Sequence, residues 1–408
     1  MKTNSEIREK IRKKTATIYT ASELKQMIRE GERVTVDSVD VVTCGTCGIM
    51  SGTTAILTVP VAPAGSFSRA DKISLNGVPC FPGPCPNERL GLVDLVVYGT
   101  ASADRRYGGG HLFRDIVEGK EILVTAEADG NIYEKTVTRD DLDFARMITT
   151  RSAFKNYSAF VNPGETAVST IFSVTGLKGG CSEVSASGCG EINPLQNWQQ
   201  FSAIRPGTRV LVNGAEGLVI GNGTRSSREK PNLSVSAEIP DMHGEYMGGF
   251  ITSEGPECIM SLALPIPVRD EKIFSYLSVP DEEITLPVND ISDRKTISEA
   301  SYGELWQETD HTISYNPDAC IGCDECYAAK SCPTGAFEPA GGVIDRRYCF
   351  NCGTCIQSCP GGAFKGNLGS LSVRGRDVPV TLRQSDRARA EEICCDLKER
   401  ILNGEFLI

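Results

Sequence analysis

The sequence predicts an α+β fold, in which a mixed α-β main domain contains a small cysteine-rich module inserted near its C-terminal end. Helix-type and strand-type segments alternate with glycine-rich turns through most of the chain, a mixture typical of α+β proteins. Many of the 17 cysteines fall between residues 320 and 359. Residues 370–408 then show strand and helix patterns again, so structured chain flanks the module on both sides.

The composition limits the classes of function. The 408 residues carry a formal net charge of −11, with 40% hydrophobic and 23% charged residues, as in a globular protein with a substantial core. A negative charge disfavours a nucleic-acid surface, which needs a basic face. No apolar run is long enough to span a bilayer, and the N-terminal segment has no apolar region of an export signal. We expect a cytoplasmic protein that binds neither nucleic acid nor membrane.

Local signals predict short helices and strands in the main domain. Thr20 with Glu23 forms a capping box before an apolar run, which marks the start of a helix. Asp129-Gly130 between two apolar runs marks a hairpin turn. Proline and acidic residues in 266–310 predict a connector along the surface. The expected helices are 5–14, 21–31, 112–120 and 141–154, and the expected strands are 33–45, 91–102, 120–128, 131–138 and the two arms of 208–224.

The chain after the module is expected to complete the main domain. Residues 369–381 predict a strand pair with a tight turn at Gly375. Residues 386–406 predict a helix with an apolar stripe that ends at Gly404. The expected organisation is therefore a main domain at 1–309, the module at 310–368, and a C-terminal hairpin and helix at 369–408.

Two cysteine ladders define the module. The second has the spacing C-x2-C-x2-C-x3-C-P, by which bacterial ferredoxins hold [4Fe–4S] clusters. In the first ladder the first three cysteines have the same spacing, but five residues rather than three separate the third cysteine from the last. By resemblance to dicluster ferredoxins, cluster one would take Cys320, Cys323, Cys326 and Cys359, and cluster two Cys349, Cys352, Cys355 and Cys332. We expect a ferredoxin-like 2×[4Fe–4S] module, with zinc or free thiols as the alternatives.

Four cysteines outside the ladders form two pairs in glycine- or proline-rich loops, Cys44 with Cys47 and Cys80 with Cys85. They could converge on zinc or a third iron–sulfur cluster, act as reactive thiolates, or be buried as small apolar groups. An iron content near eight per chain would indicate two clusters, and one near twelve a third. Cys181 and Cys189 are expected either to carry sulfur or to be buried. Cys258, Cys394 and Cys395 are expected to pack in the core.

A glycine run suggests a site for an acidic ligand. The stretch RRYGGGH places Arg105 and Arg106 before the amides of Gly108, Gly109 and Gly110 and before His111. Free amides at the start of a helix, together with an arginine, bind carboxylate, sulfonate or phosphate. With only three histidines in the chain, His111 is the leading acid–base candidate, and a structural histidine is the alternative.

Several of these stretches resemble the homocysteine-biosynthesis (HcyBio) family of archaeal and anaerobic bacterial proteins. The similar stretches are DVVTCGTCGIMSGTTA, YGGGHLFRDIVEGKEI, SGCGEINPL, NGAEGLVIGNGT and the C-terminal tail from Ser370. A fused dicluster ferredoxin is similar to the branch of methanogenesis-marker metalloproteins, marker sixteen. The best-understood branch converts aspartate semialdehyde to homocysteine with a ferredoxin-type partner. Its key cysteines fall where this chain has Ser51 and near Ile132, so those two roles do not carry over.

The resemblance implies sulfur insertion into a small acidic aldehyde, which replaces oxygen by sulfur and consumes two electrons. The product would be homocysteine, or coenzyme M if the substrate is sulfoacetaldehyde. Cys44 or Cys47 would carry sulfur, His111 would protonate the leaving oxygen, and the arginines and glycine amides would hold the acidic group. Sulfide or a persulfide and an external low-potential electron donor are the expected partners, and homo-oligomerisation is left open. The alternative is an electron-transfer or metallocentre-assembly subunit of a methanogenic enzyme.

Overall fold

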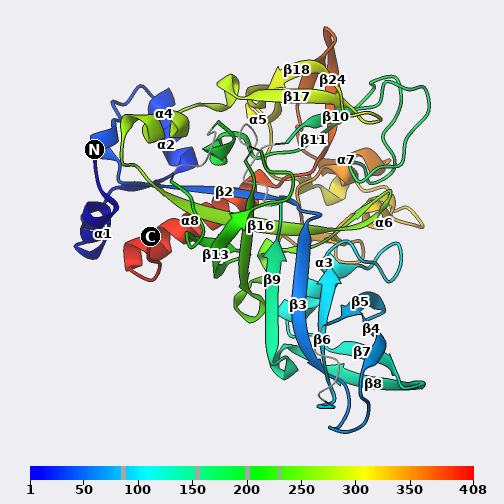
Figure 1. Cartoon of the computed structure of the whole chain (residues 1–408). Coiled ribbons are helices and arrows are strands. Elements are labelled where there is room, and N and C mark those ends of the chain that lie inside the picture. The colour runs from blue at the N-terminus through cyan, green and yellow to red at the C-terminus, as the bar shows by residue number, and fades with distance from the viewer. Residues whose placement is uncertain (84–88, 152–156, 198–202, 228–230) are drawn as a thin grey trace.

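A long mixed sheet forms the frame of the protein in the computed structural model, which describes residues 1–83, 89–151, 157–197, 203–227 and 231–408. Thirteen of its fourteen strands follow one path, and the fourteenth, β15, pairs only with β16. The strands in order are β1 Ile18–Thr20, β2 Val41–Ile49, β16 Gly255–Pro267, β12 Arg209–Val212, β13 Ala215–Asn222, β14 Leu233–Glu238, β9 Phe144–Thr149, β3 Thr53–Pro60, β6 Leu92–Tyr98, β5 Val78–Pro82, β4 Ala70–Leu75, β7 Ile122–Ala128 and β8 Asn131–Val137, with β15 at Gly248–Thr252. Strands β3, β6 and β9 extend away from the crossing pair β2 and β16 (Figure 1).

A second, six-stranded sheet lies above the β2–β16 pair (Figure 1). Its order is β18 Thr296–Ser301, β17 Thr285–Asp290, β10 Ala159–Val161, β11 Val184–Ala186, β24 Arg376–Arg383 and β23 Ser370–Val373. Strands from both sides of the cysteine-rich module therefore belong to one sheet. The proline-rich stretch 266–310 was predicted to be a surface connector, but it contributes α4 Glu271–Leu277, β17, β18 and α5 Tyr302–Trp306.

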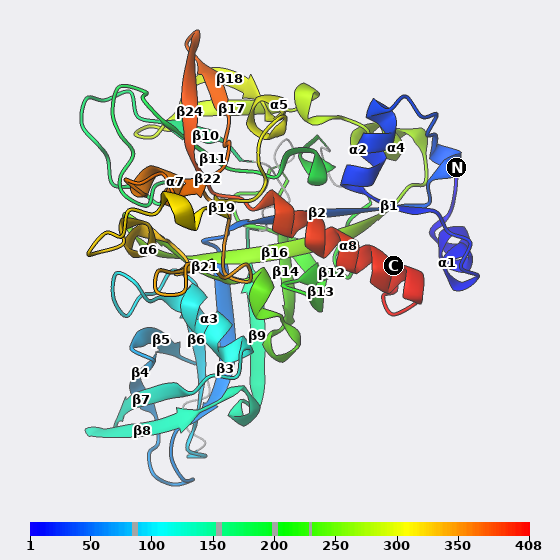
Figure 2. The same ribbon diagram turned by 180° about the vertical axis from the view of Figure 1, so that it is seen from behind.

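The remaining main-domain helices pack on these sheets. They are α1 Asn4–Arg12, α2 Ala21–Arg29, α3 Gly109–Val117 and α8 Arg387–Asn403. Helix α8 runs across β2 and β16 (Figure 2), and its buried Ile393, Leu397 and Ile401 are the predicted stripe. The capping box at Thr20 and Glu23 and the left-handed Gly404 after α8 are also confirmed. Among the described residues, no helix is long and apolar enough to cross a membrane.

Glycines let α8 approach strand β2, which explains one error of the sequence analysis. Cys44 and Cys47 were predicted to lie in a loop, but they lie inside β2. A Cβ atom on Gly45 would lie 2.5 Å from Sγ of Cys394 and 2.9 Å from the carbonyl oxygen of Ala390. The glycine pattern around the cysteines therefore serves close packing of a strand rather than a loop.

The predicted helix at 141–154 was also wrong. Residues 144–149 form β9, whose buried positions alternate at Ala145, Met147 and Thr149. Strand β9 pairs with β3 on one side and β14 on the other. Backbone pairing on both edges and burial of alternate side chains outweighed the local helical spacing.

The close approach at Gly45 predicts a measurable loss of stability. Gly45→Ala is expected to lower the free energy of unfolding by about 1–3 kcal/mol, because the new methyl group overlaps α8. Chemical unfolding would measure the change. Gly341→Ala is the control, since its Cβ would meet only atoms 3.7 Å away or farther. Equal stabilities of the two variants would contradict the prediction.

Candidate functional site

Residues 310–368 form a compact module in which each cysteine ladder runs into a short helix and then a two-residue strand. The first ladder leads through α6 Tyr327–Ser331 to β20 Phe337–Glu338, and the second through α7 Thr354–Ser358 to β22 Phe364–Lys365. Strand β19 Ser314–Tyr315 pairs with β22, and β21 Val343–Ile344 pairs with β20. The five-residue spacer of the first ladder is helix α6 itself.

The ladder thiols fall into two groups. Burial raises the pKa of Cys355, and the nearby Cys352, Cys349 and Cys332 raise it further. In the other group, Tyr315 bonds to Cys320, and the thiols of Cys326 and Cys359 add to the increase in its pKa. The first group contains four cysteines and the second three, without Cys323, and the assignment of ligands to two clusters stays a prediction.

Backbone amides point at the last cysteine of each ladder. The N–H of Ala336 donates to Sγ of Cys332 at 3.3 Å, and that of Ala363 to Sγ of Cys359 at 3.4 Å. Such bonds stabilise cluster thiolates. Within the described ranges, no three thiol, imidazole or carboxylate groups are placed to hold a single metal ion.

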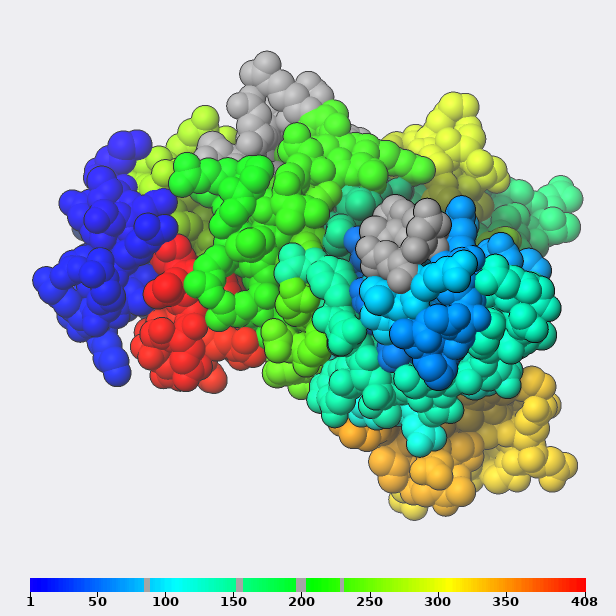
Figure 3. All heavy atoms as spheres, turned by 60° about the horizontal axis from the view of Figure 1, so that its bottom comes forward, coloured from blue at the N-terminus to red at the C-terminus, as the bar shows by residue number. Residues whose placement is uncertain are grey.

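The second half of the module packs on the main domain. The ring of Phe350 meets Phe250 of β15 edge-on, with centroids 5.3 Å apart. The hydroxyl of Tyr348 donates to Glu118 at 2.7 Å, and the guanidinium of Arg114 lies 4.0 Å from the Tyr348 ring centroid. In Figures 1 and 2 the module lies between the six-stranded sheet and α3. Figure 3 shows its orange part as a separate lobe on the surface.

Beneath this contact lies a cluster of buried thiols. Cys47 of β2, Cys189, Cys394 of α8 and the ladder residue Cys352 belong to one apolar cluster. Sγ of Cys189 donates to the carbonyl oxygen of Cys47 at 3.6 Å. Burial raises the pKa of Cys47 to about 12 and that of Cys189 to about 11. These thiols are therefore protonated at neutral pH, contrary to the expectation of a reactive thiolate.

Residues 383–386, which we call the linking segment, connect β24 to α8 and bind this cluster from several sides. The N–H of Arg383 donates to the carbonyl oxygen of Cys352 at 2.9 Å, and the N–H of Asp386 donates to that of Cys47 at 3.1 Å. The Asp386 carboxylate also accepts from the side chain of Asn351, at 3.2 and 3.3 Å. These four hydrogen bonds thus attach the linking segment both to the second ladder and to Cys47 of β2.

A buried arginine supports the same junction. Arg389 donates to the carbonyl oxygens of Arg347 at 3.1 Å and Cys349 at 2.7 Å, and it lies 3.8 Å from the Asp386 carboxylate. Burial raises the pKa of Asp386, and Arg389 opposes that increase. The arginine therefore holds the module and compensates the buried carboxylate.

A groove of about 490 Å³ opens between the module and the main domain. Arg106 and Lys330 contribute positive charge to it, and the ladder residue Cys332 lies in its wall. Val174, another wall residue, packs against the buried thiol cluster. The groove therefore places two basic side chains near ladder and main-domain cysteines, and the ammonium of Lys330 also pairs with Glu325 at 2.9 Å. Arg106 also donates to the carbonyl oxygen of Lys330 at 2.9 Å.

The glycine run does not provide free amides. The N–H of Gly109 donates to Ala101, that of Gly110 to Gly99, and that of Gly108 to Nδ1 of His111 at 3.3 Å. Burial lowers the pKa of His111 to about 4, so it is neutral at physiological pH. In this structure these residues hold α3 against the ends of β6 and β16, and Arg105 points to solvent.

The other candidate cysteines lie apart. Cys44 is on the opposite face of β2 from Cys47, and nearby Lys25 partly offsets the burial that raises its pKa to about 12. Cys80 is on β5, near the other end of the long sheet, and does not join Cys44 and Cys47. Cys85 lies outside the described residues. Cys181 packs in the core of the six-stranded sheet.

Ser51 and Ile132, the positions at or near which the best-understood branch of the family has its key cysteines, also lie apart from each other. Ser51 is half-buried and bonds to Glu257, a residue that is 5% exposed and whose carboxylate has one oxygen without a hydrogen-bond partner among the described residues. Ile132 is 69% exposed on β8. Sequence reasoning did not single out Glu257, Arg389 or Asp386, because the contacts that matter come from distant parts of the chain.

Arg389 predicts a large loss of stability when its charge is removed. Arg389→Met is expected to lower the free energy of unfolding by about 3–5 kcal/mol, because Asp386 would remain buried without its cation. Asp386→Asn in the same chain should restore part of the loss. The exposed pair Arg12–Glu9 provides the control, and Arg12→Met should cost less than about 1 kcal/mol. Similar unfolding midpoints for both arginine variants would contradict the assignment.

The lowered pKa of His111 predicts that the stability of the folded protein depends on pH. Below about pH 6.5 the unfolded chain binds a proton at this residue, whereas the folded chain does so only near pH 4. Stability should therefore fall by about 3 kcal/mol as the pH drops through this window. Unfolding of His111→Asn across pH 4–7 should show a shallower slope, while exposed His243→Asn should match the parent protein. An unchanged slope in His111→Asn would refute this.

Comparisons with known proteins support the resemblance. The model of the family described as homocysteine biosynthesis enzyme, sulfur-incorporation, matches residues 16–408. An uncharacterised protein of Methanothermobacter thermautotrophicus is 45% identical over 99% of this chain and 94% of its own length. An L-aspartate semialdehyde sulfurtransferase of Methanocaldococcus jannaschii is 31% identical over 75% of this chain and 62% of its own length.

A shorter similarity involves a subunit of another enzyme. Pyruvate synthase subunit PorD of Methanothermobacter marburgensis is 42% identical over 48 residues, which are 12% of this chain and 56% of that protein. No solved structure matches the chain. Since the family match extends through both sheets, the module and α8, the chain belongs to the homocysteine biosynthesis, sulfur-incorporation family.

Proposed function

We propose that this protein is an iron–sulfur-dependent sulfurtransferase that inserts sulfur into a small acidic aldehyde. Family membership and the similarity to L-aspartate semialdehyde sulfurtransferases support the reaction class. The observation that carries the proposal is the shared packing of ladder residue Cys352 with Cys47 and Cys189, behind a groove containing Arg106 and Lys330. Electron-carrying and sulfur-bearing groups would then meet at one place.

The module would hold two [4Fe–4S] clusters. Cluster one would use Cys320, Cys323, Cys326 and Cys359, and cluster two Cys349, Cys352, Cys355 and Cys332. The grouping of these thiols and the amides of Ala336 and Ala363 fit this assignment. When bound, such clusters supply electrons one at a time.

The reaction has a defined electron balance. Sulfide adds to the aldehyde carbon to give a thiohemiacetal, and two electrons and two protons then convert it to a CH2–SH thiol with loss of water. Arg106 and Lys330 would hold the substrate's carboxylate or sulfonate in the groove. If the sulfur comes from a persulfide donor, Cys47 would take it over as a persulfide and two further electrons would release it as sulfide, whereas Cys44 lies on the other face of the strand. His111 and the amides of Gly108–Gly110 are not part of this proposal, because they are used to fix α3.

One observation favours a second function. Cys44 and Cys47 are fully buried, and burial raises the pKa of each to about 12, so neither is an accessible thiolate in this conformation. A module that passes electrons to another protein would need no such nucleophile. An electron-transfer or metallocentre-assembly subunit is therefore the alternative.

Anaerobic turnover tests the two proposals. The cluster-reconstituted full chain would be given sulfide and a low-potential reductant with either aspartate semialdehyde or sulfoacetaldehyde, and thiol products would be identified by mass. Homocysteine or coenzyme M is the expected product. Whichever aldehyde is the substrate, Arg106→Gln should raise the KM for it about tenfold or more, while the exposed control Arg105→Gln should leave that KM unchanged. Intact, reducible clusters without a thiol product would refute the enzyme and favour the alternative.

A further inference from the structure

We propose that Cys47 and Cys189 are a redox pair that stores two electrons next to cluster two by opening and closing a disulfide bond. The inference deepens the proposed function and rests on it in one respect, namely that the module binds cluster two. It gives a role to Cys189, which neither the family comparison nor the ladder motif assigns.

The two residues are neighbours in a closed environment. Both are fully buried, and Sγ of Cys189 lies 3.6 Å from the carbonyl oxygen of Cys47. The hydroxyl of Thr46 approaches the same sulfur at 3.8 Å. Cys189 also raises the pKa of Cys47, as expected for two thiols in close range. Soluble thiol reductants would not reach either sulfur in this conformation.

The turn that carries Cys189 is fixed on both sides. The N–H of Gly188 donates to Oγ of Ser385 at 2.8 Å, and its carbonyl oxygen accepts from the Trp306 indole at 3.1 Å. On the other side, the N–H of Glu191 donates to Asp281 at 2.7 Å. A turn held this firmly places its thiol at a defined position against β2.

The linking segment joins the pair to cluster two. Its residues bond to the backbone of Cys352 through Arg383, to the turn of Cys189 through Ser385, and to Cys47 through Asp386. Cys352 also belongs to the same buried cluster as both thiols. Electrons that leave cluster two through Cys352 therefore have a short, bonded path to the pair.

Two alternatives are less well supported. Metal binding would need a third ligand, but in the described part of the chain no three such groups are placed to hold an ion. Simple packing would explain apolar burial but not why both thiols lie beside a ladder cysteine. A pair of thiols that accepts electrons one at a time and stores two of them is useful here, because replacement of the aldehyde oxygen consumes two electrons.

The redox step is balanced. The disulfide between Cys47 and Cys189 takes up two electrons and two protons, its S–S bond breaks, and two thiols result. The electrons come one at a time from an external low-potential one-electron donor through cluster two, and the protons come from water. Removal of the two electrons reverses the step and closes the bond.

A reductive titration tests the pair. The reconstituted full chain would be oxidised anaerobically with thionine, a dye that accepts electrons from the clusters, freed of the dye and titrated with dithionite while cluster absorbance is followed. The parent protein should take up about four electrons per chain, about two in the clusters and two in the pair. Cys189→Ala and Cys189→Ser should take up about two. Acid quenching, alkylation and peptide mass analysis of the oxidised protein should show a Cys47–Cys189 bridge.

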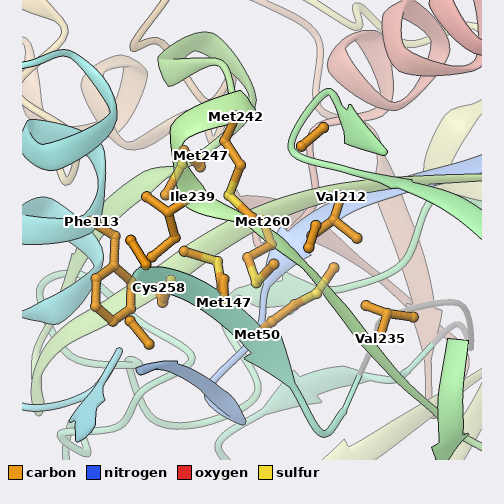
Figure 4. Close-up of a cluster of buried hydrophobic side chains, with 14 of the residues drawn as sticks. Met50, Phe113, Met147, Val212, Val235, Ile239, Met242, Met247, Cys258 and Met260 are labelled. Carbon is orange, nitrogen blue, oxygen red and sulfur yellow. The ribbon is translucent and has the colours of Figure 1, made fainter. Parts of the chain in front are cut away.

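The control is Cys258→Ala, which removes an equally buried thiol on the other face of the sheet, where Met50, Met147 and Met260 surround it (Figure 4). It should retain an uptake of about four electrons. Equal uptake by the parent and both Cys189 variants, or a bridge from Cys47 to Cys394, would overturn the inference. The titration needs no substrate, so absence of a thiol product in turnover would refute the proposed function while leaving this result interpretable.

Discussion

The linking segment is the constraint on which the arrangement of the site depends. Its four residues bond to β2, to β11, to the turn of Cys189 and to the second cysteine ladder. These elements come from distant parts of the chain, and the linking segment is a hydrogen-bond partner that all of them share. Because Arg383 ends β24 and Asp386 caps α8, the segment also has little freedom of its own. The position of the module relative to the buried thiols is therefore set by backbone hydrogen bonds rather than by surface contacts alone.

A buried network of charges supports this arrangement from the other side. Arg387, the first residue of α8, pairs with Asp281 at 2.5 Å and with Glu191 at 3.3 Å, and Arg29 also binds Glu191. Charges removed from water stabilise a fold only when they are well paired and hydrogen-bonded. Here the pairing ties α2, α8 and the turn after Cys189 to one place. The network fixes the relative positions of these elements, although removing its charged groups from water costs free energy.

Features of the fold that depend on neighbouring residues could be predicted from the sequence. The hairpin turns at Asp129-Gly130 and at Gly375 have the expected positive φ angles, and the capping box at Thr20 begins α2. The strand β9 could not be predicted in this way, since its pairing with β3 and β14 involves residues far along the chain. The glycines of β2 were interpreted as loop residues because nothing local shows that α8 packs against them.

The candidate site, like the fold, could be predicted only where its residues lie close together in the sequence. Ladder spacing could assign eight cysteines to one module because ferredoxin ligands lie close in sequence, and the division of these cysteines between two clusters stays a prediction. Cys47 was a candidate, but its neighbour Cys189 is 142 residues away and only the fold brings them together. The expected amide site at Gly108–Gly110 failed because its N–H groups already donate to Gly99 and Ala101 in the loop after β6 and to the side chain of His111.

The insertion of the module has a consequence for the order of synthesis. Strands β23 and β24, the linking segment and α8 all follow the module in the chain. During translation the edge of β11 and one face of β2 must therefore wait, unpaired and uncovered, until the whole module has left the ribosome. The cysteine ladders are thus available to the cluster-assembly machinery before the main domain can close over them.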